Sequence, residues 1–279
     1  MKRIKEDTYI GERALYMLEN AEVFNCIFEN GESPLKETRN LLVRNSEFRW
    51  KYPIWYSKDV LCSNIVFKDT ARSGVWYTDN IEIVDSIIHA PKTFRRCSDV
   101  RLTNVKITNA QETLWKCRYV KLKDITANGD YFGFNSEDVE VDNLYLDGNY
   151  AFDGGKNIIV RNSVLNSKDS FWNVENLLVE DSFINGEYLA WNSKNVTFKN
   201  CKIISHQGLC YIDNVKLINC QLIDSDLCLE LCSNIDAQIT NDVESIKNPI
   251  SGVIRVKSIK ELILDEKVID PNKTKIIYE

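Results

Sequence analysis

Histidine is scarce in this sequence of 279 residues, which contains only His89 and His206. Two histidines do not supply a zinc site with paired ligands, and no Ser/His/Asp triad is evident. No apolar run approaches the roughly 18 residues that a membrane helix requires. A basic stripe is also missing, because the net charge is −6 and the pI is near 5.2. We therefore expect no metal site, no cofactor, no membrane span and no nucleic-acid partner.

A secretory leader is not evident either. Residues 1–10 are charged and lack an apolar segment followed by a small-residue cleavage site, so we expect no signal peptide. Nine cysteines, an odd number without paired spacing, are typical of a reducing cytoplasm. Cys201 and Cys220 stand one repeat apart, and we expect their thiols to stack, with a reduced pair favoured over a disulfide. Cys228 and Cys232 have no second pair at zinc spacing. These features predict a cytoplasmic protein.

What the sequence does contain is a repeat. The stretch 158–176, IIVRNSVLNSKDSFWNVEN, returns in 177–195 with the same alternating apolar residues followed by Asn. The first apolar position of each copy recurs every 19 to 21 residues, at Ala21, Leu41, Val60, Ile81, Val100, Val120, Val139, Ile158, Leu177, Val196, Val215, Ile235 and Ile254. A short period that hardly drifts is typical of a solenoid.

Apolar and polar residues alternate within each copy, as in Val139-Glu-Val141, which indicates half-buried strand rather than helix. Three such pieces fit in each copy. The sequence therefore predicts an all-β fold, a right-handed parallel β-helix of about 12 coils of 19–21 residues with three short strands per coil. A leucine-rich horseshoe is the alternative. We disfavour it because those repeats are dominated by Leu and need a helical or loose convex side.

One β-helix domain is expected over residues 1–279. Residues from about 1 to 20 should form an N-terminal cap and partial coil, about 21 to 241 the regular coils, and about 242 to 279 C-terminal coils and a cap. Two columns of Asn and Asp support this organisation, because both residues tolerate the left-handed backbone of a corner and their stacked side chains can hydrogen-bond. We interpret the columns as architecture rather than as metal ligands, since they recur at nearly every turn.

The third strand of each coil carries the candidate site. Five of the six tryptophans fall directly after its inward residue or one position later, and alternation directs this face outward. An exposed aromatic row marks a docking surface, and a saccharide matches rings flanked by acids, amides and arginine. The residues predicted to bind it are Trp55, Trp76, Arg95, Trp115, Lys116, Phe134, Trp172 and Trp191. The same alternation predicts that Gly133, Phe152, Ala190 and Cys210 also point outward, with Trp191 joining the row if its turn is shifted by one residue.

Turns beside the aromatic row bring acidic side chains next to it. Asp130, Asp169 and Glu187 are candidate catalytic residues, because carboxylates on neighbouring turns can lie about 5 Å apart, as in retaining glycosidases. Glycine in these turns also has a purely conformational explanation. Two alternatives stay open for the face: tryptophans that pack over the turns as a structural ladder, and a protein partner.

A second surface follows the outward residues of the second strand. It contains two apolar blocks, from Val66 to Ile87 and from Tyr145 to Phe183. Such blocks are a candidate interface for a homo-oligomer.

Several motifs together resemble a bacterial family of single-stranded right-handed β-helix proteins of unknown function, grouped in the pectate-lyase-like superfold. They are GESPLKE at 31–37, KYPIW at 51–55, APK at 90–92, ETLW at 112–115, NGDY at 128–131, NGEY at 185–188 and KNPISG at 247–252. The resemblance spans nearly the whole chain and implies the fold and a cytoplasmic bacterial setting, with no assigned activity or functional residues. Pectate lyases hold calcium with clustered acids and use an arginine as base; Asp130, Asp153 and Arg95 are not evidently on adjacent turns.

The sequence thus favours a protein that binds a saccharide along the third-strand face. Catalysis on that saccharide, as a lyase, hydrolase or isomerase, is a further hypothesis. The alternative is a non-catalytic scaffold or protein-interaction solenoid.

Overall fold

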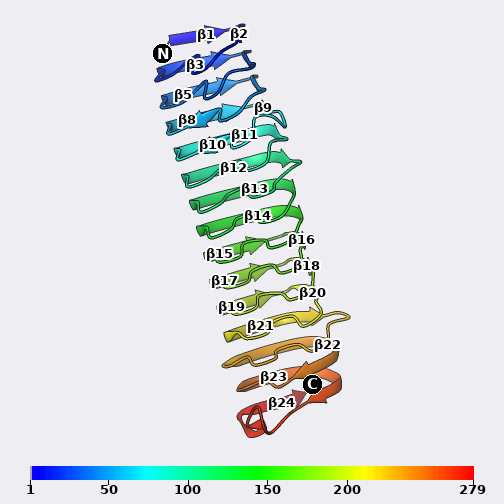
Figure 1. Cartoon of the computed structure of the whole chain (residues 1–279). Helices are drawn as coiled ribbons and strands as arrows, with labels where there is room; N and C mark the ends of the chain where they lie inside the picture. The colour runs from blue at the N-terminus through cyan, green and yellow to red at the C-terminus, as the bar shows by residue number, and fades with distance from the viewer. Residues whose placement is uncertain (1) are drawn as a thin grey trace. The chain divides into compact units, whose positions relative to one another are not determined.

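The computed structural model describes residues 2–279 as an all-β parallel solenoid (Figure 1). Its coordinates group into two compact units, one ending at Tyr145 and the other beginning at Leu146, and each is described by itself. Among the described residues, no helix has the length and apolar character needed to cross a bilayer. The predicted fold class, a right-handed parallel β-helix, is confirmed.

Unit 1 is built from parallel strands that recur once or twice per coil. They are β1 (Lys2–Lys5), β2 (Thr8–Tyr9), β3 (Glu19–Phe24), β4 (Ile27–Phe28), β5 (Arg39–Arg44), β6 (Glu47–Phe48), β7 (Ile54–Trp55), β8 (Lys58–Ser63), β9 (Val66–Phe67), β10 (Val75–Trp76), β11 (Asp79–Ile88), β12 (Ser98–Ile107), β13 (Arg118–Asn128) and β14 (Glu137–Asp147), whose last residues fall in unit 2. In the longer strands the first and second sides of a coil are continuous.

Unit 2 continues the same pattern of strands. They are β15 (Lys156–Arg161), β16 (Val164–Asn166), β17 (Glu175–Glu180), β18 (Phe183–Asn185), β19 (Lys194–Lys199), β20 (Lys202–Ile204), β21 (Asp213–Leu222), β22 (Ile235–Lys247), β23 (Gly252–Ile263) and β24 (Thr274–Tyr278), with a short 3-10 helix, η1 (Pro271–Lys273), before the last strand.

The number of coils differs from the prediction. There are about 15 turns rather than about 12, because the regular pairing extends further toward both ends than the apolar pattern indicates. β1 pairs in register with β3, so one more coil precedes the coil that contains Ala21. At the other end β24 pairs with β23. Charged residues in β1 and β24 interrupt the alternation of apolar and polar residues by which the inner strands are recognised.

The last predicted repeat position is also displaced. Gly252, not Ile254, pairs with Ile235, and Ile254 pairs with Ala237. Only glycine fits there: its φ is +125°, and a Cβ would lie 2.1 Å from the carbonyl oxygen of Ile235. The repeat is therefore shorter than predicted at this point, where two coils approach too closely for a side chain.

Corners between the strands use the two Asn/Asp columns. Asn176, with φ +62°, donates from Nδ2 to Oδ1 of Asn157 at 2.9 Å, and Asn195 donates in turn to Asn176 at 2.9 Å. In the second column Asn64 donates to Asn45 at 2.9 Å. Each corner thus combines a left-handed residue with a side-chain hydrogen bond to the next coil.

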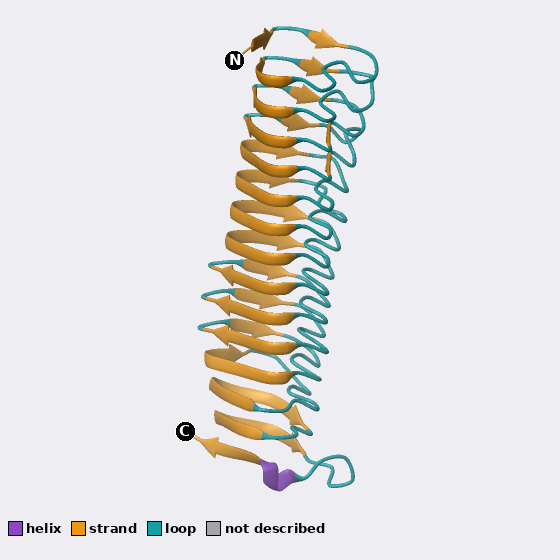
Figure 2. Ribbon diagram, turned by 90° about the vertical axis from the view of Figure 1, so that its left-hand side faces the viewer, coloured by secondary structure: helices purple, strands orange, loops and turns teal. Residues whose placement is uncertain are grey.

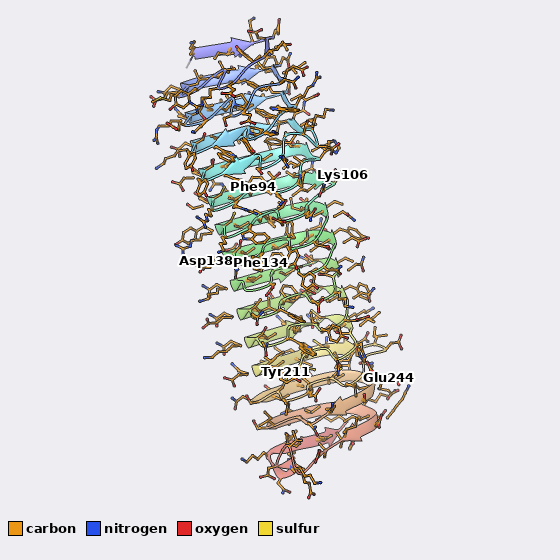
Figure 3. The ribbon with its side chains drawn as sticks, viewed as in Figure 1. Phe94, Lys106, Phe134, Asp138, Tyr211 and Glu244 are labelled. Atoms are coloured by element: carbon orange, nitrogen blue, oxygen red, sulfur yellow. The ribbon has the colours of Figure 1, made fainter. Side chains whose placement is uncertain are left out.

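Inward side chains stack along each unit and form its core. In unit 1, Phe28, Phe48 and Phe67 form a continuous stack with ring centroids 4.9 Å apart. In unit 2, Phe152 stacks on Phe171 at 5.6 Å. Many outward residues at the edges of the coils are charged, such as Asp138 and Lys106 of unit 1, which Figure 3 labels. The core is therefore a set of ladders, each residue packing on its equivalent one coil away.

The third side of each coil, where the sequence predicts a third strand, differs from the prediction. Within the part of the chain that the structure describes, only β7 and β10 form strands there, and in Figure 2 the loops gather on one side of the coils. The inward residues of the later coils have positive φ, as at Phe94 (+58°), Leu114 (+57°) and Phe171 (+58°). A backbone that alternates between left-handed and other conformations is not an extended strand, so the period-two rule for side-chain direction fails on this side.

Candidate functional site

The third side of unit 1 carries an aromatic and cationic ladder. Trp55 stacks on Trp76 with centroids 5.0 Å apart and planes 6° from parallel. The Arg95 guanidinium lies 4.6 Å from the centroid of Trp76 and 5.0 Å from that of Trp115. Phe134 follows Trp115 at 4.4 Å. We call these five residues the unit 1 ladder.

Most ring faces in the unit 1 ladder are already occupied. Each member lies against the next, and Tyr52 packs against Trp55 at 4.5 Å. The Nε1 of Trp76 donates to the carbonyl oxygen of Lys92 at 2.8 Å, and that of Trp55 to Ser73 at 2.6 Å. A ligand would therefore meet the ring edges of the ladder, because its faces and two of its N–H groups are used internally.

Arg95 is held within the ladder by more than stacking. Its Nη2 donates to Oε2 of Glu112 at 3.0 Å, and Lys92 contacts the other oxygen of Glu112 at 3.2 Å. Nε of Arg95 is buried with no hydrogen-bond partner. Glu112 therefore contacts both cations. Arg95 also fills the space between Trp76 and Trp115, so its planar guanidinium packs in the ladder as an aromatic ring would.

Unit 2 contains a second, shorter ladder. Trp172 and Trp191 stack at 5.7 Å with planes 10° from parallel, and Tyr211 meets Trp191 edge-on at 5.1 Å. Nε1 of Trp172 donates to the carbonyl oxygen of Tyr188 at 2.6 Å, and that of Trp191 to Gln207 at 2.6 Å. We call Trp172, Trp191 and Tyr211 the unit 2 ladder. The turn that contains Trp191 is shifted by one residue, so that Ala190 is buried and Trp191 stacks on Trp172.

Four residues predicted to point outward do not. Phe152, Ala190 and Cys210 are fully buried, and Gly133 is buried as well. The physical reason is the left-handed backbone, with φ +58° at Phe152, +57° at Ala190 and +77° at Gly133, which places two consecutive residues inward before the outward one. Phe134 consequently occupies the tryptophan column itself. Lys116 is exposed in the column beside it, where its N–H donates to the carbonyl oxygen of Phe134 at 2.8 Å.

A groove of about 450 Å³ lies in unit 2 beside the start of the third side. Its wall alternates amide, ammonium, carboxylate and imidazole groups on consecutive coils. The lining residues are Asn149, Asn166, Ser167, Lys168, Asn185, Gly186, Glu187, Ile204, Ser205, His206 and Asp224. Gly186 lets adjacent coils approach, because a Cβ there would lie 2.0 Å from the carbonyl oxygen of Ser167. We call this feature the unit 2 groove.

One ion pair and one histidine–aspartate hydrogen bond are the main polar contacts at the groove. Lys168 Nζ contacts Oε2 of Glu187 at 2.7 Å, and this bond raises the pKa of the lysine. His206 Nδ1 lies 2.7 Å from Oδ1 of Asp226. Tyr188 joins the groove to the unit 2 ladder, since its ring meets Trp191 at 5.3 Å and His206 at 5.9 Å. The groove and the ladder are therefore one continuous surface of unit 2.

Asp169 lies beneath this surface. It is 5% exposed with φ +57°, and burial raises the pKa of its carboxyl, although Lys168 and a hydrogen bond with Tyr150 oppose the shift. Asp153 is one of the charges that raise it further. Burial also raises the pKa of Asp153, which accepts a hydrogen bond from Nδ2 of Asn173 at 3.0 Å.

The structure thus brings together two of the three predicted acids. Asp169 and Glu187 lie on adjacent coils of unit 2, where the Asp169 N–H donates to the carbonyl oxygen of Glu187 at 2.9 Å. Asp130 belongs to unit 1, and its carbonyl oxygen accepts from the N–H of Glu112 at 2.9 Å. Within residues 2–279, no group of three or more His, Cys, Asp or Glu side chains is arranged to hold a metal ion.

Sequence reasoning missed several groove residues. They are Asn149, Asn166, Asn185 and His206, together with Asp226, which contacts His206, and Asp153 beneath the surface. A column count would have found two of them, because Asn149 and His206 fall in one column with Lys168 and Glu187 at intervals of 19 residues.

The family model described as "Protein of unknown function (DUF3737)" matches residues 2–277. No curated protein matches this sequence. Similar solved structures include PfbA, a surface adhesin of Streptococcus pneumoniae, with 13% identity, coverage of 84% of this chain and 72% of that one, and a TM-score of 0.40. A mannuronic acid specific polysaccharide family 6 lyase from human gut microbiota has 9% identity, coverage of 94% and 83%, and a TM-score of 0.40. The A-module of the Azotobacter vinelandii mannuronan C-5 epimerase AlgE4 has 10% identity, coverage of 96% and 86%, and a TM-score of 0.29.

Proposed function

The chain belongs to DUF3737, a family of proteins of unknown function, and we propose that it binds a saccharide in the unit 2 groove. The observation that carries the proposal is the wall of the groove, where successive coils present hydrogen-bonding side chains at a repeated spacing. Its volume of about 450 Å³ lies within the range of small-molecule sites.

The chemistry of the groove matches hydroxyl groups. Asn166 and Asn185 are paired in register on β16 and β18, so their amides offer donors and acceptors on consecutive coils. Lys168 and Glu187 add a charged donor and a charged acceptor, whose hydrogen bonds to hydroxyls are stronger than neutral ones. A ligand with several adjacent hydroxyls satisfies such a surface, whereas an apolar ligand leaves it unpaired.

The tryptophan rings of the unit 2 ladder do not offer their faces for stacking against a sugar. Trp172 and Trp191 use their faces on each other and their N–H groups on carbonyl oxygens. A saccharide in the groove therefore meets ring edges, with Tyr188 at the junction. We extend the proposal to the ring edges of the unit 1 ladder and to Lys116 beside it.

Isothermal titration against a panel of neutral and acidic oligosaccharides tests the proposal. We expect at least one to bind, and Asn185→Ala or Lys168→Ala to weaken it about tenfold, which corresponds to about 1.4 kcal/mol. Lys156→Ala is the matched control, because Lys156 is also half-exposed and paired with a glutamate, Glu175 at 3.7 Å, outside the groove. No heat with any oligosaccharide, or an equal loss in the control, would contradict the proposal.

One observation favours a second candidate, a non-catalytic scaffold. The ladders are internally satisfied, and stacked residues of this kind can serve stability alone. In that case the variant Trp76→Ala lowers the unfolding temperature, and titration detects no saccharide. The same titration therefore separates the two candidates.

A further inference from the structure

His206 in the unit 2 groove is hydrogen-bonded to Asp226, which lies outside the groove lining, and saccharide binding alone does not use this pair. Their side chains are 45% and 41% exposed, so the pair is open to a ligand. Backbone hydrogen bonds fix them on adjacent coils: Tyr188 N–H donates to His206 O at 2.9 Å, and Gln207 N–H donates to Asp226 O at 3.0 Å. Backbone hydrogen bonds between coils thus hold both partners, which lie in turns and loops outside the strands.

The hydrogen bond decides which imidazole nitrogen is available. A carboxylate only accepts hydrogen bonds, so Nδ1 of His206 is the donor to Oδ1 of Asp226 at 2.7 Å. Nε2 then carries the lone pair. An imidazole oriented in this way is a general base, and the carboxylate stabilises the imidazolium that forms when it takes a proton.

The other groups near His206 decide which class of reaction its imidazole could catalyse. Glu187, on the preceding coil, is paired with Lys168 at 2.7 Å, so its carboxylate is an acceptor and not a proton donor. Glycoside cleavage normally needs a carboxylic acid that protonates the leaving oxygen. Tyr188 lies edge-on to the imidazole at 5.9 Å, and Asp224 lines the groove. Of the two acids that line the groove, Glu187 is therefore committed to Lys168, and the imidazole of His206 is the group available as a base.

Ester hydrolysis needs what the groove has, a base and donors for a developing oxyanion. Lys168 uses one of its three N–H donors on Glu187, which leaves two. The amide of Asn185 is on the same wall. Ser167 lines the groove too, and its Oγ has no partner although the residue is only 2% exposed. Its Oγ is therefore a buried polar atom at the groove wall that the protein leaves without a hydrogen bond.

We propose that the unit 2 groove hydrolyses an O-acyl ester carried by a saccharide, with His206 as catalytic base and Asp226 as its positioning residue. The inference rests on the proposed saccharide-binding function. Nε2 takes a proton from water as the water oxygen bonds to the acyl carbon. The bond from that carbon to the sugar oxygen then breaks, and the imidazolium returns the proton to this oxygen. The products are a carboxylic acid and a free hydroxyl, with no change in oxidation state.

The test uses the full chain with peracetylated cellobiose and acetylated xylo-oligosaccharides, and acetate release is followed by proton NMR. We expect acetate above the buffer rate, and a loss of about 10²- to 10⁴-fold in kcat for His206→Gln. His89→Gln, which changes the only other histidine, should keep the wild-type rate. Thermal melts of the variants check folding, which the exposure of His206 should preserve.

Asp226→Asn separates positioning from a structural role. It should lower kcat, leave KM unchanged and move the pH profile, because the amide favours the wrong imidazole tautomer. No acetate release from any of these esters, or full activity in His206→Gln, overturns the inference. If unmodified oligosaccharides still bind in titration, only the esterase inference fails; if none binds, the proposed function fails with it.

Discussion

At the scale of single residues, Asp169 departs from the repeat that surrounds it. The coils on either side place Tyr150 and Tyr188 at the equivalent position, as their backbone hydrogen bonds show. Asp169 instead buries a carboxyl next to Asp153. Burial of a charge is unfavourable, and this departure makes Asp169 a candidate for a functional role.

The raised pKa of Asp169 gives a pH prediction. A carboxyl whose folded pKa is raised contributes stability that is present below its unfolded value, near 3.8, and is lost as pH rises through the folded pKa. Asp169→Asn should therefore be more stable than the wild type at pH 7, with a gap that narrows toward pH 4. Urea unfolding at several pH values measures this.

Asp213→Asn is the control, because the pKa of Asp213 is lowered where that of Asp169 is raised. Hydrogen bonds from Ser233 and Asn234 lower the pKa of Asp213, so its contribution to stability is present at neutral pH and is lost in acid. This variant should be less stable than the wild type at pH 7. If both variants shift in the same direction at every pH, the account of Asp169 is wrong.

The cysteines give a second prediction at this scale. All nine are free and buried, and burial raises the pKa of Cys62 to about 12. A buried neutral thiol is a poor nucleophile. Ellman's reagent should therefore react with no cysteine in the native protein and with nine in denaturant. Fast native reaction of one or more thiols would contradict the burial. The predicted reducing cytoplasm stays a prediction.

At the scale of elements, the corners carry the architecture. Asn176 combines φ +62° with hydrogen bonds to Asn157 and Asn195. Asn176→Ala loses both bonds and strains the backbone, so the free energy of unfolding should fall by about 1–2 kcal/mol from the left-handed conformation alone. Asn176→Gly loses the bonds without the strain and should be the more stable variant. Equal losses in urea unfolding would show that conformation is not the reason for asparagine there.

Strands and corners could be predicted from the sequence, and the third side could not. The pairs Ala21 with Leu41 and Ile158 with Leu177 follow from alternation, because extended strands obey it. On the third side, residues such as Phe152 and Ala190 adopt positive φ, which alternation cannot anticipate. Of the site, Asp169 and Glu187 were predicted from their turns. His206 and Asp226 were not, because their pairing depends on which turns stack.

At the scale of the whole molecule, the apolar blocks of the second side predict self-association. In unit 1, Val66 pairs with Ile87, which is 39% exposed, and in unit 2 Val164 pairs with Phe183. We expect light scattering to detect an oligomer that Ile87→Lys or Phe183→Lys weakens. Thr126→Lys, in the same column outside the blocks, should not. A wild-type monomer at every concentration would contradict this interface.

The most direct test of the central claim is a crystal structure of the protein soaked with an oligosaccharide that binds in titration. The account predicts density in the unit 2 groove, with sugar hydroxyls within hydrogen-bond distance of Asn185 and Lys168. An empty groove at saturating concentration, or sugar rings stacked elsewhere on the protein, would contradict it.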